Sequence, residues 1–92
     1  MTQQTTFSKQ ARTDCARIRL EEDEASNVVD YPDDDFARAD RFAPGRVLHY
    51  FARHLDDDKV LVVTCREQID RWHALRVSLI GSTDYQRLRS GV

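Results

Sequence analysis

Cysteine, proline and glycine are all scarce in this sequence, which has two, two and three of them among 92 residues. Cys15 and Cys65 lie far apart, so they form neither a CxxC motif nor the dense framework of a disulfide-rich protein. We interpret them as two buried thiols, because a free cysteine behaves as a small apolar side chain. The few prolines and glycines argue against a low-complexity or largely disordered chain.

Long apolar runs are absent as well. No segment approaches the roughly 18 to 20 apolar residues of a membrane-spanning helix. The start MTQQTTFSKQ has neither the basic end nor the apolar centre of an export signal, so we expect a cytoplasmic protein. The length suits a single domain over residues 1–92. We expect residues 1–5 to be disordered, because this polar start offers little to pack.

Motifs of catalysis, phosphate binding and metal binding are also missing. The metal-ligating residue types are scattered and lack the spacing of a zinc site; they are Cys15, His49, His54, Cys65 and His73. A nucleophilic Cys65 beside His49 or His73 stays open as a hypothesis for a catalytic or metal site, although such pairs arise by chance. We expect a protein that is not an enzyme and that binds no cofactor or metal.

The densest apolar segment runs from Lys59 to Ile80. Its β-branched run over residues 60–63 predicts a buried strand. Thr64 and Glu67 then have the spacing of a capping box, which marks the start of a helix. Apolar residues recur at helical spacing up to Gly81; they are Ile69, Trp72, Leu75 and Leu79. We predict a long helix over residues 65–80 as the spine of the core.

Helical spacing elsewhere predicts an amphipathic helix over residues 6–25 and a short second helix over 33–42. A hairpin at about 47–64 gives the predicted strand a partner for its backbone groups. Ser82 can cap a last short helix that ends near Gly91.

These elements predict a small α+β domain with an N-terminal helix, a short β-hairpin and a long C-terminal core helix. An all-α bundle is the alternative, because Leu61 and Cys65 extend the helical spacing backwards towards Asp58. Whether residues 46–64 form a hairpin or a helix decides between the two.

Acidic residues are concentrated in one segment, although the formal net charge is only −2. Residues 21–35 hold eight acids and no lysine or arginine, whereas basic residues outnumber acids in 1–20 and in 36–55. An acidic surface with apolar side chains among its charges is suited to a basic partner protein. The residues expected to bind it are Glu21, Glu22, Asp23, Glu24, Asp30, Tyr31, Asp33, Asp34 and Asp35.

We therefore expect a protein-binding module, such as an inhibitor that covers a basic or nucleic-acid-binding surface of its partner. Antitoxins, immunity proteins and phage-encoded anti-CRISPR proteins are classes in which this strategy is expected, by analogy of size and charge only. A simpler interpretation is that the acids form a solvated surface without a partner.

Nucleic-acid binding is the first alternative function, because arginines are frequent in the C-terminal third; they are Arg66, Arg71, Arg76, Arg87 and Arg89. Their excess over acids in that segment is small, and the acidic runs before it would repel phosphate. We therefore rank this function second.

Overall fold

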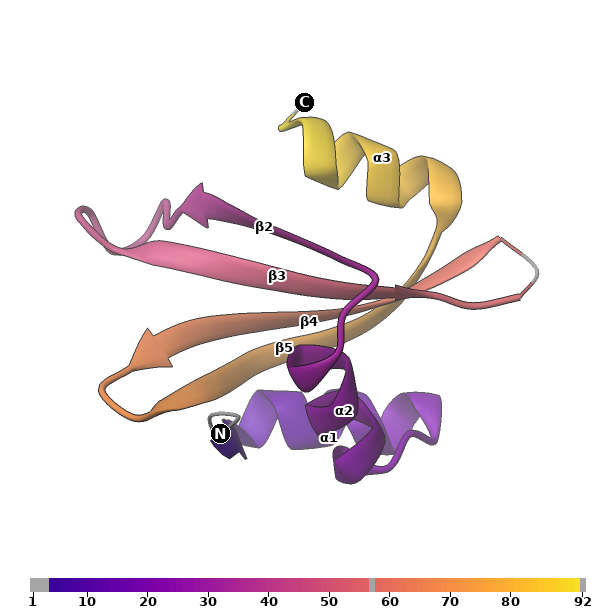
Figure 1. Ribbon diagram of the computed structural model, residues 1–92, viewed down its shortest axis with the longest axis horizontal. Coiled ribbons are helices and arrows are strands. Elements are labelled where there is room, and N and C mark those ends of the chain that lie inside the picture. Colours follow the sequence, from indigo (N-terminus) through magenta and orange to yellow (C-terminus); the bar gives the residue numbers. More distant parts are fainter. Residues whose placement is uncertain (1–3, 57, 92) are drawn as a thin grey trace.

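The computed structural model describes residues 4–56 and 58–91, which form an α+β domain with one mixed sheet (Figure 1). The elements in chain order are β1 (Gln4–Phe7), α1 (Lys9–Ile18), α2 (Glu22–Asp30), β2 (Asp34–Ala39), β3 (Val47–His54), β4 (Lys59–Gln68), β5 (Arg71–Gly81) and α3 (Ser82–Ser90). None of the helices formed by these residues is long and apolar enough to cross a membrane.

The sheet has the strand order β1-β5-β4-β3-β2, so β4 lies at its centre. β1 pairs with β5 in parallel, and the other neighbouring strands are antiparallel. α1 and α2 cover one face of the sheet, while α3 crosses part of the other face (Figure 1).

The β-branched run in β4 explains its central position. Leu61 and Val63 pack into an apolar cluster with α1 and α2, while Val60 and Val62 pack beside Tyr85 of α3. A strand buried on both faces reads as a continuous apolar run, because successive side chains point to opposite sides. β4 pairs with β3 as an antiparallel hairpin, so the all-α bundle is wrong.

The predicted long helix over residues 65–80 is also wrong, because this segment completes β4, turns and returns as β5. Thr64 therefore pairs within the sheet and caps no helix. The register between β4 and β5 shifts beside Leu75, as a β-bulge does. The shift leaves Trp72, Ala74 and Val77 on the face that packs against α1 and α2. Ile69 and Leu79 of the predicted helical stripe are exposed instead.

Two further expectations fail in the first half of the chain. The predicted short helix over 33–42 is an edge strand, β2, which pairs with β3. The predicted helix over 6–25 is divided into β1, α1 and α2. Ser8 caps α1 by accepting a hydrogen bond from the backbone N–H of Ala11 at 3.0 Å. Arg19 ends α1 in the left-handed conformation, at φ 58°.

The start of the chain departs from the prediction, whereas the predicted last helix is present. Gln4 and Thr5, expected to be disordered, belong to β1, and the rest of the 1–5 segment lies outside the described residues. At the other end α3 starts at Ser82, with Gly81 as its N-cap, and Gly91 ends it at φ 79°.

Candidate functional site

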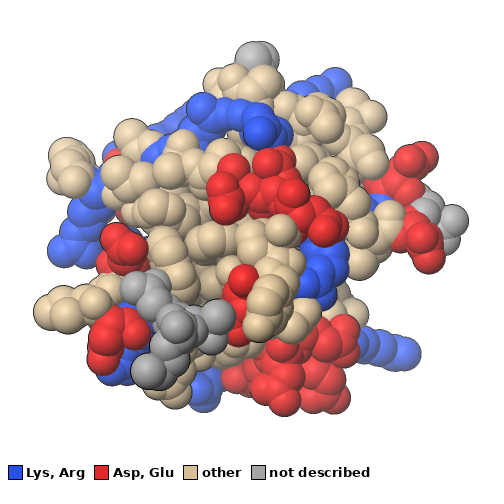
Figure 2. Space-filling view, viewed as in Figure 1, with Lys and Arg blue, Asp and Glu red and all other residues tan. Residues whose placement is uncertain are grey.

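The nine residues expected to bind a partner do not form one surface. Glu21 precedes α2, and Glu22, Asp23 and Glu24 form its first turn, whereas Asp30 and Tyr31 lie at its other end. A nine-residue helix is about 13 Å long, so the two groups are well separated. Asp33, Asp34 and Asp35 follow in and before β2. Figure 2 shows the acidic side chains as several separate groups.

Part of this acidic set is used inside the domain. Asp34 accepts hydrogen bonds from the Tyr85 hydroxyl at 2.5 Å and from Arg89 Nε at 2.6 Å. The Arg89 and Tyr85 hydrogen bonds lower the pKa of Asp34 below its ordinary value. Asp33 accepts a hydrogen bond from the backbone N–H of His54 at 2.9 Å. These two carboxylates therefore hold β2 to its neighbours.

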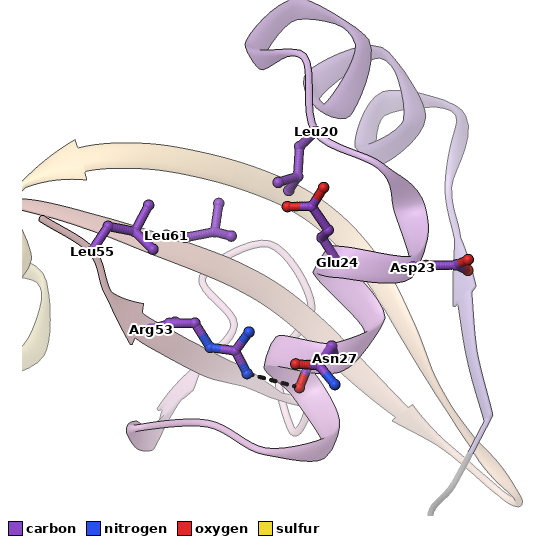
Figure 3. A pocket seen from close by; sticks show the side chains of 7 residues that line it. All are labelled: Leu20, Asp23, Glu24, Asn27, Arg53, Leu55 and Leu61. Carbon is purple, nitrogen blue, oxygen red and sulfur yellow. Dashed lines mark hydrogen bonds between the residues drawn. The ribbon is translucent and has the colours of Figure 1, made fainter.

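The first turn of α2 lies beside a groove of about 280 Å³. Three leucines converge on it, namely Leu20 before α2, Leu55 after β3 and Leu61 of β4 (Figure 3). Glu24 points towards these leucines, while Asp23 points outward from the same helical turn. Leu55 is 44% exposed whereas Leu61 is buried, so the apolar floor is open to solvent at Leu55. We name this the leucine groove.

Arg53 forms the opposite wall of the leucine groove. Its Nη2 donates to the backbone carbonyls of Tyr31 at 3.0 Å and Asn27 at 3.3 Å. A guanidinium at this position satisfies carbonyls at the C-terminal end of α2, where the helix dipole is negative. Arg53 thus has a structural role and fixes α2 against β3.

The acids at the start of α2 remain available to a partner. Glu22 approaches Arg12 at 3.9 Å, and both side chains are about half exposed or more. Among the residues that the structure describes, Glu21, Asp23 and Glu24 form no ion pair. They do complement the positive end of the helix dipole, an effect of about 0.3 to 1 kcal/mol.

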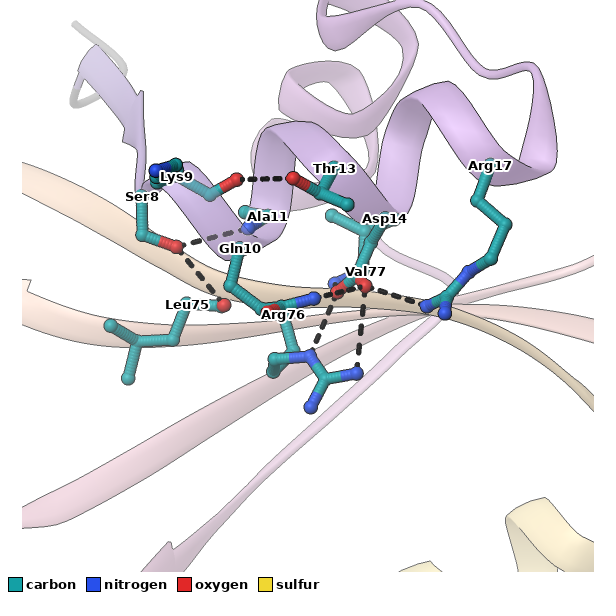
Figure 4. A network of polar contacts seen from close by, with 10 residues as sticks. All are labelled: Ser8, Lys9, Gln10, Ala11, Thr13, Asp14, Arg17, Leu75, Arg76 and Val77. Carbon is teal, nitrogen blue, oxygen red and sulfur yellow. Dashed lines mark hydrogen bonds and ion pairs between the residues drawn. The ribbon is translucent and has the colours of Figure 1, made fainter.

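The most deeply buried carboxylate, that of Asp14, is structural (Figure 4). It accepts hydrogen bonds from Arg76 Nε at 2.8 Å, Arg17 Nη2 at 2.7 Å and the Val77 N–H at 3.0 Å. Burial alone would raise the pKa of Asp14, but the hydrogen bonds from Arg76, Val77 and Gln10 lower it to about 2. The charged carboxylate joins α1 to β5.

The Cys and His residues give no support to nucleophilic chemistry. His49 and Cys65 are neighbours across β3 and β4, but burial raises the pKa of Cys65 to about 12, so its thiol stays protonated near neutral pH. His73 Nδ1 lies 2.8 Å from the Thr6 hydroxyl. Within 4–56 and 58–91, no group of three or more His, Cys, Asp or Glu residues is placed to hold a metal.

The arginines expected to bind nucleic acid are mostly engaged in ion pairs. Arg76 binds Asp14 and Arg89 binds Asp34, while Arg66 and Arg71 pair with Asp40 and Asp70. Arg87 has the weakest contact, at 4.0 Å from Asp84. These five arginines therefore do not form a single free basic surface.

The leucines of the groove were not identified from sequence. Leu20 directly precedes the acids of α2, and Leu55 directly precedes the acidic turn between β3 and β4. The sequence signal that could have identified Leu20 and Leu55 is their position directly beside a run of acidic residues. Comparison with models of known protein families, with curated proteins and with solved structures finds no match.

Proposed function

We propose that this domain is a non-enzymatic protein-binding module that covers a basic segment of a partner protein, as an inhibitor does. The surface that binds consists of the leucine groove and the acids of the first turn of α2. The observation that carries the proposal is the placement of an open apolar floor directly beside unpaired carboxylates.

This arrangement matches the usual anatomy of a protein interface, with an apolar centre and a charged rim. An apolar side chain of the partner fills the space between Leu20, Leu55 and Leu61. A lysine or arginine next to it in the partner pairs with Glu24 or Asp23. The groove is small for an organic ligand, since such pockets usually measure about 300 to 1,000 Å³, whereas it suits one anchoring side chain.

The proposed surface is narrower than the sequence predicted. It keeps Glu21, Glu22, Asp23 and Glu24 and adds the three leucines. It leaves out Asp33 and Asp34, whose carboxylates accept hydrogen bonds within the domain. Asp30, Tyr31 and Asp35 are not among the residues that line the groove and play no part in the proposal. The cytoplasmic location stays a prediction from the sequence.

The experiment compares capture of partner proteins by three immobilised forms of the domain. Asp23→Asn with Glu24→Gln removes the rim charges, and Glu67→Gln with Asp70→Asn is the matched control. The control residues are exposed acids at the β4–β5 turn, and their replacement changes the net charge equally. Extract from the native host is treated with nuclease, so that nucleic acid cannot bridge a protein to the domain.

We expect the wild type and the control to retain the same proteins and the rim variant to lose them. Raising the salt concentration weakens capture, because exposed charges are screened beyond about 8 to 10 Å. Equal retention by all three forms would show that the acids at the start of α2 are only a solvated surface.

A further inference from the structure

A second groove lies on the other side of the molecule, between the β2–β3 turn and the C-terminal end of α3. Its volume is about 570 Å³, and arginines from three elements line it. Arg38 comes from β2, Arg41 from the turn and Arg87 from α3. Leu48 and Tyr50 of β3 provide apolar surface between them. We name this the arginine groove.

The arginines of this groove have donors to spare. Arg38 Nη2 donates to the backbone carbonyls of Leu88 and Arg89. The other N–H groups of this guanidinium donate no hydrogen bond within the described residues. Its Nε atom is buried and has no hydrogen-bond partner within the described residues. A buried donor without a partner is uncommon in a folded protein. Arg87 has only the 4.0 Å contact with Asp84, and Arg41 has no acidic partner among the described residues.

Negative charge within the groove is already neutralised. Asp40 is its only acidic lining residue in the described part of the chain. The Asp40 carboxylate accepts a hydrogen bond from the Phe42 N–H at 2.9 Å and pairs with Arg66 at 3.4 Å. The groove is therefore a locally cationic surface.

Phe42 distinguishes this groove from a simple basic patch. Its side chain is 95% exposed at the groove's edge, so the ring contributes nothing to the core. Both faces of such a ring are open to a planar group. An exposed aromatic ring beside arginines matches the way in which proteins bind unpaired bases, with stacking on the ring and cationic groups on the phosphates.

From this geometry we infer that the arginine groove binds single-stranded nucleic acid, with a base on Phe42 and phosphates on Arg41, Arg87 and Arg38. A duplex does not fit this arrangement, because its bases are stacked within the helix and their faces cannot reach Phe42. An acidic peptide would use the arginines but would not need the aromatic ring. The activity is independent of the leucine groove, which lies beside α2.

The test measures fluorescence anisotropy of a labelled oligothymidylate of about 15 nucleotides, at about 50 and 200 mM salt. Phe42→Ala is the stacking variant, and Ile69→Ala at the neighbouring turn is its control, since Ile69 is also fully exposed. We expect Phe42→Ala to weaken binding by about 5-fold to 150-fold, the range for loss of one stacked base. Ile69→Ala should leave the affinity unchanged.

A second pair of variants tests the phosphate contacts. Arg41→Gln with Arg87→Gln should reduce the salt slope of log K by about 1.4, because each phosphate contact on a single strand contributes about 0.7. Arg12→Gln with Arg19→Gln removes the same charge from exposed positions on α1 and at its end, and it should leave the slope unchanged.

Three results would overturn the inference. The first is no binding of the oligonucleotide at the lower salt concentration. The second is equal loss in the groove variants and in their controls, which would indicate nonspecific charge attraction. The third is binding of polyglutamate, or of vesicles of anionic lipid, with an affinity at least equal to that for the oligonucleotide. These variants keep Asp23 and Glu24. Their results therefore neither support nor contradict the proposal that the leucine groove binds a protein.

Discussion

At the residue scale, Asp14 is the clearest case of a charge that sets the position of an element. Its carboxylate is fully buried, yet four groups donate hydrogen bonds to it, from Gln10, Arg17, Arg76 and Val77. A buried charge is tolerated when it is paired and hydrogen-bonded. Because the donors belong to both α1 and β5, the cluster fixes this helix against the sheet.

Asp14→Asn tests this role. The substitution keeps the shape of the side chain but removes the charge and half of the acceptor capacity. We expect the free energy of unfolding to fall by about 1.5 to 3 kcal/mol, the range for a hydrogen bond to a charged group. Urea unfolding measures the change. Asp70→Asn is the control, since Asp70 is an exposed partner of Arg71, and it should leave the stability nearly unchanged. Equal losses would contradict the assigned role.

The same carboxylate makes stability depend on pH. Its pKa is lowered from 3.8 to about 2 in the folded state, so the unfolded chain binds the proton more tightly. The stabilisation is therefore fully present above about pH 4 and is lost as the pH falls towards 2. Unfolding measured over this range should show a steeper acid loss for the wild type than for Asp14→Asn. Parallel curves would contradict the prediction.

At the element scale, short helices and long strands replace the architecture expected from periodicity. The apolar run over residues 60–63 was enough to predict a strand, because few helices place four branched or bulky apolar residues in succession. The helical spacing of Ile69, Trp72, Leu75 and Leu79 was a coincidence, because Ile69 lies in the β4–β5 turn and Leu79 is exposed. The bulge beside Leu75 leaves Trp72, Ala74 and Val77 on the face that packs against α1 and α2. Periodicity over one segment cannot distinguish these cases, because the spacing of apolar residues does not show where the chain turns or where a bulge shifts the register.

The central position of β4 predicts a gradient of hydrogen exchange across the sheet. Amides in the middle of β4, around Val62 and Val63, are paired between two strands and buried, so they should exchange most slowly. Amides of β1 and β2, at the two edges, should exchange faster by orders of magnitude. NMR-detected exchange measures this directly. Equal protection in β2 and β4 would contradict the strand order.

The end of α1 offers an element-scale prediction about stability. Arg19 has a φ of 58°, a conformation that costs a side chain about 1 to 2 kcal/mol and costs glycine little. Arg19→Gly should therefore stabilise the domain by about 0.5 to 1 kcal/mol. Arg12→Gly, inside the same helix, should instead destabilise it by about 1 kcal/mol. Thermal unfolding of both variants checks the sign, and destabilisation by Arg19→Gly would contradict the assignment.

At the scale of the whole molecule, the fold brings together residues that the sequence keeps far apart. The acidic start of α2 was visible in the sequence, because eight acids without a base stand out in any chain. Leu20, Leu55 and Leu61 were not recognised as their neighbours, since the crossing of α2 over β3 and β4 sets their proximity. Asp34 was assigned to the partner surface for the converse reason: its partners, Tyr85 and Arg89, arrive from the other end of the chain.

The two grooves give the molecule two surfaces of opposite character. The leucine groove combines an apolar floor with acids of α2, and the arginine groove combines cationic groups with an exposed aromatic ring. Formal net charge, at −2, conceals this division. Charge complementarity affects the rate of encounter and the choice of partner more than the stability of the fold.

The most direct test of the leucine groove uses a fluorescent peptide in which one leucine is flanked by arginines. Anisotropy titration measures its binding to the wild type, to Leu55→Ser, to Asp23→Asn with Glu24→Gln, and to the Glu67→Gln with Asp70→Asn control. We predict that the wild type and the control bind alike and lose affinity as salt rises, while each groove variant loses about tenfold, or 1.4 kcal/mol. Equal binding by all four proteins would contradict a partner site at the leucine groove.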